Sequence, residues 1–169
     1  TCGQRMSFAE IDRQIEPFVS DAARPFFYPY MQGCPYPPVA GSVFAAFARL
    51  MQHHDWRAMA ASVLEGVALQ VCWMWDAYPH GVKEPAYIMT GGASASPLWR
   101  QMLANALNQP VTIPENPDIG CLGAAMLAGI GAGLFPDAPD AYAALAQTSI
   151  RVKPDGQTGF FQERMRQYK

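Results

Sequence analysis

Apolar residues recur at helical spacing over residues 55–78, the longest such pattern in this chain. A stripe this broad predicts a helix that is buried over much of its circumference. Pro79 and Gly81 should end this helix. Glu65 interrupts the apolar surface, and we expect its carboxylate to bond a backbone group or a charged partner. The stripe comprises Trp56, Met59, Val63, Val67, Val71, Met74 and Tyr78, and it is widened by Leu64, Ala68, Cys72 and Trp75.

Further along, short apolar runs alternate with helical patterns. The predicted elements are a strand at 86–90, a helix at 97–107, a strand at 111–113 and a helix at 119–130. Ser96 before Pro97 is a preferred pairing of N-cap and first helical residue. Asp118 is a suitable N-cap for the second of these helices. Strands that alternate with helices indicate an α/β layer with crossover helices.

The other predicted elements are shorter. Ser7 caps a helix at 7–18 that Pro17 should end early, and the following proline-rich segment holds a strand at 26–28. The apolar run at 41–50 predicts another short helix. A helix at 138–146, a strand at 149–152 and a final helix complete the chain. We interpret the basic end of that last helix, residues 164–169, as solvated.

Composition is that of an ordinary globular domain. The 169 residues fit one domain, half of them are hydrophobic, and 15% are charged. The net charge of −2 gives no basic footprint for nucleic acid, and no basic cluster indicates a membrane surface. The apolar stretch 121–135 is too short for a membrane span. Four well-separated cysteines without a C-x-x-C pair indicate reduced thiols in a cytoplasmic protein.

Gly91 and Gly92 lie between a predicted strand and a predicted helix. Neither glycine has a Cβ, so a ligand can contact the backbone directly. The helix start behind them offers N–H groups and the positive end of a dipole, which suits a nucleotide phosphate. Taken alone, the pair is better explained by a simple left-handed turn between strand and helix, and Ser96 is first of all an N-cap.

The surrounding motifs decide between these interpretations. Residues 90–104, TGGASASPLWRQMLA, resemble the nucleotide motif of the FGGY carbohydrate kinases. Residues 118–128, DIGCLGAAMLA, resemble the second C-terminal signature of that family. Residues 27–33 resemble its Pro-Tyr-x-x-Gly segment, and His54 with residues 63–68 resembles its long helix. Because the four motifs keep the family's order over nearly the whole sequence, the chain is identified as a member of this family.

The resemblance implies an α/β fold of the ribonuclease-H-like type that actin and hexokinase share. It implies that residues 1–169 form a single domain, the C-terminal part of the second, nucleotide-holding lobe. The cofactor would be ATP or ADP with Mg²⁺. Gly91, Gly92 and Ala93 would lie beside the phosphates and ribose, and Ser96 beside the adenine. The small residues of the helix at 119–130 would let it pack behind the nucleotide turn.

The same resemblance limits what the chain can do. In the family, the sugar pocket, the first phosphate loop and the catalytic Asp come from sequence that precedes the part matched here. No residue of this chain resembles that Asp, so we assign no catalytic or metal residue and expect the chain to be inactive alone. The sequence departs from the family pattern at Cys34-Pro35, at Ala61-Ser62 and at Cys121. Residues 98–101 look more like the xylulose and gluconate branch than the glycerol branch.

Two other functions stay open. The chain could be a non-catalytic interaction module, or a serine hydrolase, since residues 92–96 are similar to a nucleophile elbow without its final glycine. The expected partners are a nucleotide, a sugar only together with the missing lobe, and neither nucleic acid nor membrane. Thr1 in place of Met favours a piece of a longer protein. Strands missing from the sheet would leave an open edge, so we also expect a homo-oligomer, or cover from a missing segment.

Overall fold

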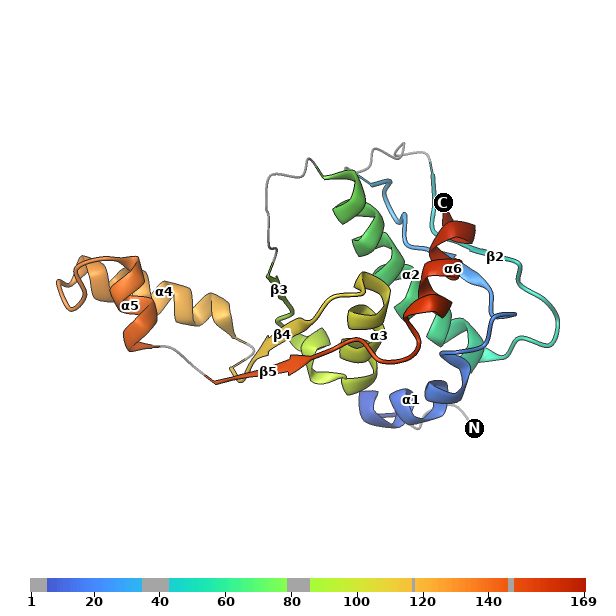
Figure 1. The fold of residues 1–169 in the computed structure, drawn as a ribbon, viewed down its shortest axis with the longest axis horizontal. Helices are drawn as coiled ribbons and strands as arrows, with labels where there is room; N and C mark the ends of the chain where they lie inside the picture. The colour runs from blue at the N-terminus through green and yellow to red at the C-terminus, as the bar shows by residue number, and fades with distance from the viewer. Residues whose placement is uncertain (1–5, 35–42, 79–85, 117, 146–147) are drawn as a thin grey trace.

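The computed structural model describes residues 6–34, 43–78, 86–116, 118–145 and 148–169. In this part of the chain, helices and strands form one packed body from which a helical hairpin projects (Figure 1). The helices are α1 (Phe8–Ile15), α2 (Trp56–Ala77), α3 (Pro97–Leu107), α4 (Ile119–Gly131), α5 (Ala138–Ala144) and α6 (Thr158–Tyr168). The strands are β1 (Phe26–Tyr28), β2 (Ala46–Ala48), β3 (Tyr87–Ile88), β4 (Val111–Pro114) and β5 (Ser149–Val152), and two 3₁₀ helices are η1 (Glu16–Phe18) and η2 (Gly92–Ala95).

Helix α2 is the centre of the body, and its predicted position is confirmed. Asp55 caps it by accepting the backbone N–H groups of Arg57 and Ala58 at 2.9 and 3.2 Å. These hydrogen bonds, that from Ala58 above all, hold the pKa of Asp55 below its usual range. Among the described helices, α2 alone is long and apolar enough to cross a membrane, and half of it is buried within the fold, as in the core helix of a globular domain.

The buried face of α2 differs from the predicted stripe. Four stripe residues are exposed, and the buried face instead holds mostly small residues, together with Glu65, Leu69 and Gln70. The reason is close packing: at Gly66 an added Cβ would lie 2.1 Å from the carbonyl oxygen of Phe27 in β1. Small side chains let β1 approach the helix axis, and several of the large apolar side chains of the stripe lie on the outer face, whereas Leu69 is buried against Phe26 of β1. The exposed stripe residues are Trp56, Val71, Met74 and Tyr78.

The main sheet has the order β3-β4-β5. β3 and β4 are parallel and joined by the crossover helix α3, as predicted, whereas β5 pairs antiparallel with β4. β3 and β5 are therefore the two edges of this sheet. Val111 and Ile113 of β4 are buried against Ala104 of α3 and Met89, which follows β3.

A second sheet pairs β1 with β2 in antiparallel register. The predicted helix at 41–50 is therefore wrong within the described residues, which begin at 43. The rings of Phe27 and Phe47 lie 4.9 Å apart across the two strands. Short apolar runs fit either element locally, and here the cross-strand contact with β1 decides in favour of a strand.

The C-terminal helix α6 is part of the core, which corrects the prediction of a solvated end. Arg164 and Tyr168 are each 2% exposed. Glu65, which is fully buried, accepts Nε of Arg164 at 2.8 Å and its NH2 at 2.5 Å. The Nη2 atom of Arg24 lies 2.8 Å from Oε1 of the same Glu65 carboxylate. The expectation of a charged partner for Glu65 is confirmed, with two arginines sharing one carboxylate.

Arg164 also connects the last helix to residues 22–26. It donates hydrogen bonds to the carbonyls of Ala22, Arg24 and Pro25 at 3.0–3.2 Å. Its guanidinium lies 3.7 Å from the ring centroid of Phe26, a cation–π contact. Burial lowers the pKa of Arg24, and the adjacent Glu65 opposes that shift. Residues 22–26 are thus held against α2 by a side chain from the last helix.

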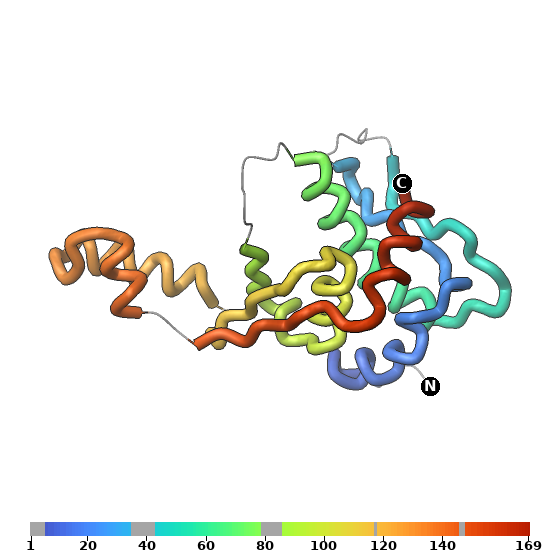
Figure 2. Tube along the Cα trace, in the orientation of Figure 1, coloured from blue at the N-terminus to red at the C-terminus, as the bar shows by residue number. Residues whose placement is uncertain are grey.

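Helices α4 and α5 form the projecting hairpin (Figure 2). The position of α4 is as predicted, and Asp118 caps it by accepting the N–H of Cys121 at 3.1 Å. The expected packing of α4 behind the nucleotide turn is wrong: α4 packs against α5, and a Cβ added at Gly123 would meet no atom within 4 Å.

Candidate nucleotide site

The turn between β3 and α3 is shaped by Gly91. Pairing continues past β3, where the N–H of Met89 donates to the carbonyl of Thr112 at 2.9 Å. Gly91 then adopts φ +77°, a backbone conformation that residues with a side chain rarely take. Gly92 begins the 3₁₀ helix η2, which the sequence did not predict between the glycine pair and α3.

The glycine pair is open to solvent on its outer side. Gly91 and Gly92 are both exposed, and a Cβ added at either would meet no atom within 4 Å. Within the described parts of the chain, no group occupies the space beside this backbone, as a ligand cradle requires. Ala93 follows in η2 and is half-buried. The first N–H groups of η2 have no carbonyl acceptor within that helix, so they can donate hydrogen bonds to an anion.

Two serines fix the shape of the turn. Ser94, which sequence reasoning did not select for the nucleotide site, is 2% exposed and donates its hydroxyl to the carbonyl of Gly91 at 2.7 Å. A hydroxyl three residues after a glycine is the signal that could have identified this bond. Because it faces the backbone, this hydroxyl is not presented as a nucleophile. Nε of Arg100 also donates to the carbonyl of Ser94.

Ser96 caps α3 as predicted. Its hydroxyl accepts the N–H of Trp99 at 3.0 Å, and its carbonyl accepts the N–H of Arg100 at 3.1 Å. Pro97 has no N–H, so much of the donor capacity at this helix start is absent or already used. The hydroxyl of Ser96 keeps its own proton and a second lone pair for a ligand. Anion binding is therefore better provided by η2 than by the first turn of α3.

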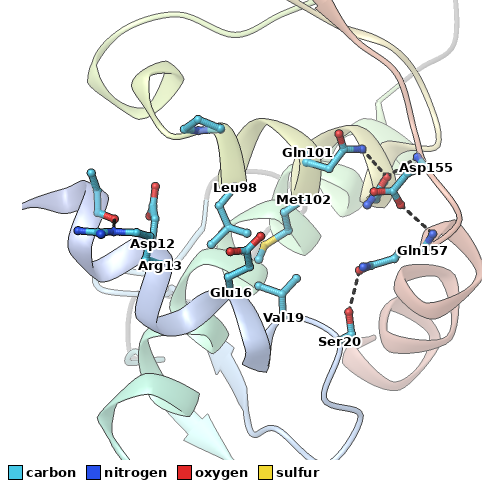
Figure 3. Close-up of a pocket in the computed structure, with 13 residues that line it drawn as sticks. Asp12, Arg13, Glu16, Val19, Ser20, Leu98, Gln101, Met102, Asp155 and Gln157 are labelled. Atoms are coloured by element: carbon cyan, nitrogen blue, oxygen red, sulfur yellow. Dashed lines mark hydrogen bonds between the residues drawn. The ribbon is translucent and has the colours of Figure 1, made fainter.

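A cleft of about 530 Å³ adjoins this helix start (Figure 3). It lies between α1 and α3 and opens beside Pro97 and Leu98. Its apolar lining is formed by Val19, Leu98 and Met102, which point into the cleft in Figure 3. Sequence reasoning missed this cleft because α1 and α3 are far apart in the sequence. The other lining residues are Ala9, Asp12, Arg13, Glu16, Ser20, Pro97, Gln101, Asn105, Asp155 and Gln157.

One wall of the cleft is a chain of hydrogen bonds. Oδ1 of the buried Asn105 accepts Nε2 of Gln101 at 3.1 Å and the N–H of Asp155 at 2.9 Å. Asp155 accepts the N–H of Gln157, whose Oε1 accepts the hydroxyl of Ser20 at 3.0 Å. These bonds join α3, the segment before α6 and the segment after η1, so the wall is held in place from three directions.

The described residues hold no group of three or more His, Cys, Asp or Glu side chains that could bind a metal ion. The four residues predicted for the cofactor, Gly91, Gly92, Ala93 and Ser96, lie together on one turn. What they provide chemically is backbone donors, open space and one hydroxyl.

Comparison with known proteins places this geometry in a family. Residues 11–132 match the FGGY family of carbohydrate kinases, C-terminal domain. A glycerol kinase of Myxococcus xanthus is 33% identical over 138 residues, which is 80% of this chain and 28% of the relative. The chain thus spans about a third or less of the proteins it resembles.

Solved structures agree on the fold. A ligand-bound xylulose kinase from Lactobacillus acidophilus superposes with a TM-score of 0.79 at 23% identity, over 95% of this chain and 33% of that protein. A Plasmodium falciparum glycerol kinase with ADP superposes with a TM-score of 0.71 at 18% identity, again over 95% of this chain and 33% of that protein. The predicted actin- and hexokinase-like fold is confirmed. The chain belongs to the FGGY family of carbohydrate kinases and matches that family's C-terminal domain over residues 11–132.

Proposed function

We propose that this chain is the nucleotide-binding C-terminal portion of an ATP-dependent sugar kinase. The observation that carries the proposal is the turn at Gly91 and Gly92, where two exposed glycines border space that no described atom occupies. Residues 1–169 would form one partial domain, and the sugar-binding lobe would lie outside them. The parent enzyme would transfer the γ-phosphoryl group of ATP to a hydroxyl of a ketose, sugar acid or polyol in the cytoplasm.

The nucleotide would lie along the turn. The N–H groups of Gly92 and Ala93 would bind phosphate oxygens at the start of η2. The base would lie beside Ser96, at the entrance of the cleft that begins at Pro97 and Leu98. The apolar floor and amide-rich wall of the cleft suit a planar heterocycle with ring nitrogens.

Bound ATP with Mg²⁺ would supply the transferable phosphoryl group. Phosphoryl transfer also needs a base for the sugar hydroxyl and in-line positioning of that hydroxyl. We assign neither task to a residue of this chain, so we propose that it binds nucleotide without phosphorylating sugar when alone. The names of the relatives, which include glycerol and xylulose kinases, keep several sugar classes open.

The test is binding of a fluorescent ADP analogue to the purified chain. A leucine at position 92 has room within the protein but would fill the space proposed for phosphate, so Gly92→Leu should weaken binding at least about tenfold, 1.4 kcal/mol. Gly159→Leu is the matched control, because an added Cβ at Gly159 also meets no atom within 4 Å. Equal affinity of the two variants, or no affinity in the unchanged chain, would contradict the proposal.

A second candidate function is a non-catalytic interaction module derived from such a kinase. The exposed apolar side chains on α2 favour it, since large exposed apolar patches mark interaction surfaces. Light scattering together with the ADP measurement separates the two functions. Association without nucleotide affinity would support the interaction module.

A further inference from the structure

Arg100 is the only positively charged residue in the segment that carries the glycine turn. No other Lys or Arg occurs between Lys83 and Arg151, a stretch that holds β3, η2, α3, β4, α4 and α5. A nucleoside diphosphate carries several negative charges, whereas the glycine turn itself offers only uncharged backbone N–H groups. A cation beside the turn would therefore supply the charge-assisted hydrogen bonds that the turn lacks.

Helical spacing directs the side chain of Arg100 toward this turn. The residue continues the sheet-facing stripe of α3, in which Leu103, Ala104 and Leu107 pack beside β4. Side chains tilt toward the N-terminus of their helix, so that of Arg100 points toward the segment that follows β3. The hydrogen bond from its Nε to the carbonyl of Ser94 confirms this direction. Ligands of α/β sheets commonly bind at this edge, where parallel strands end.

The two Nη groups of Arg100 remain for a ligand. No hydrogen bond or ion pair joins either Nη atom to a residue that the structure describes. The side chain is half-buried, so part of it is open to a bound molecule. A guanidinium anchored through Nε still presents two N–H donors side by side, and this pair matches two oxygens of one phosphate group.

We propose that Arg100 binds the phosphate nearest the ribose of a bound adenine nucleotide. This inference rests on the proposed nucleotide site, in which the N–H groups of Gly92 and Ala93 bind phosphate and the base lies beside Ser96. The bond from Arg100 to Ser94 holds the guanidinium between these two positions along the turn. A nucleotide laid along the turn brings its α-phosphate to Arg100, while its terminal phosphate stays at the start of η2.

Binding of adenosine, AMP and ADP, each measured by displacement of the fluorescent ADP analogue, tests the proposal. Arg100→Gln should raise the dissociation constants of AMP and ADP about tenfold and leave that of adenosine unchanged, because adenosine carries no phosphate. Arg100→Lys keeps the charge without the planar pair of donors, so it should recover part of the lost affinity. Arg166→Gln removes the charge of an exposed arginine on α6 and is the matched control, with all three constants unchanged. Circular dichroism confirms that each variant is folded.

The pattern across the three ligands separates the possible outcomes. Equal losses for adenosine and AMP in Arg100→Gln would mean that Arg100 only holds the turn through Ser94, and this result overturns the proposal. Unchanged AMP and ADP affinity in Arg100→Gln, while Gly92→Leu still weakens ADP binding, overturns it too but leaves the proposed nucleotide site intact. If the unchanged chain bound none of the three ligands, the nucleotide site and the role of Arg100 would both be wrong.

Discussion

Replacing Glu65 by Gln removes the charge that two buried guanidinium groups share. Arg24 and Glu65 are both 0% exposed, and Arg164 is 2% exposed. Within the described residues, Nε and Nη2 of Arg24 have no hydrogen-bond partner, and Nη1 donates to the carbonyl of Phe18, so the nearby carboxylate of Glu65 is what compensates the positive charge. Breaking a buried ion pair costs about 3–5 kcal/mol, because an uncompensated charge stays behind. Arg164 keeps its three carbonyl bonds, so we expect the lower end, about 3 kcal/mol.

Urea unfolding measures this loss, read as a shift in midpoint at unchanged slope. Asp76→Asn is the matched control, since it makes the same carboxylate-to-amide change on the same helix. The pair of Asp76 with Lys169 is exposed, at 56% and 41%, and should cost no more than about 1 kcal/mol. If Glu65→Gln were no more destabilising than Asp76→Asn, the shared carboxylate would not be the stabilising group inferred here.

Three further predictions test other parts of the structure. Gly66→Ala should lower the free energy of unfolding by about 1–3 kcal/mol, because the added Cβ would lie 2.1 Å from a carbonyl oxygen of β1. Gly123→Ala in α4, where an added Cβ meets no described atom within 4 Å, should raise the free energy of unfolding by about 0.5–1 kcal/mol. Thermal unfolding checks both variants. Cys72 is buried, and burial raises its pKa to about 12, whereas Cys121 is exposed although its contact with Asp118 also raises its pKa. At pH 8 a thiol reagent followed by peptide mapping should therefore label Cys121 slowly and leave Cys72 unlabelled until the protein unfolds. The pKa of Asp55 is lowered in the folded state, so the stabilising effect of this carboxylate is present above about pH 4 and is lost as the pH falls through the folded-state pKa. Acid unfolding of Asp55→Asn should therefore show a weaker dependence on pH in that range. An acid-unfolding profile identical to that of the unchanged chain would contradict this.

The elements that sequence predicted well are those whose signals are local. The bounds of α3 follow from Ser96 and Pro97 at its start and from Asn108, which ends it in a left-handed conformation at φ 51°. The glycine turn is likewise encoded by adjacent residues. Ser96 and the two glycines were accessible to sequence reasoning because no distant partner defines their geometry.

What sequence did not predict depends on contacts between distant residues. The strand β2 exists because Phe47 meets Phe27, and Arg164 is buried because Glu65, ninety-nine positions earlier, accepts its hydrogen bonds. The buried face of α2 is set in part by the close approach of β1 at Gly66, a contact between residues about forty positions apart that the periodic pattern of the helix does not reveal. The cleft beside α3 needs three separate segments.

The contact of Arg164 with the carbonyls of residues 22–25 also bears on how the chain is made. Synthesis proceeds from the N-terminus, so residues 22–25 leave the ribosome long before their partner exists. Until residue 164 has been synthesised, Glu65 and Arg24 lack the third member of their charge cluster. We therefore expect nascent chains stalled before residue 164 to be digested readily by protease, and chains that contain α6 to resist it.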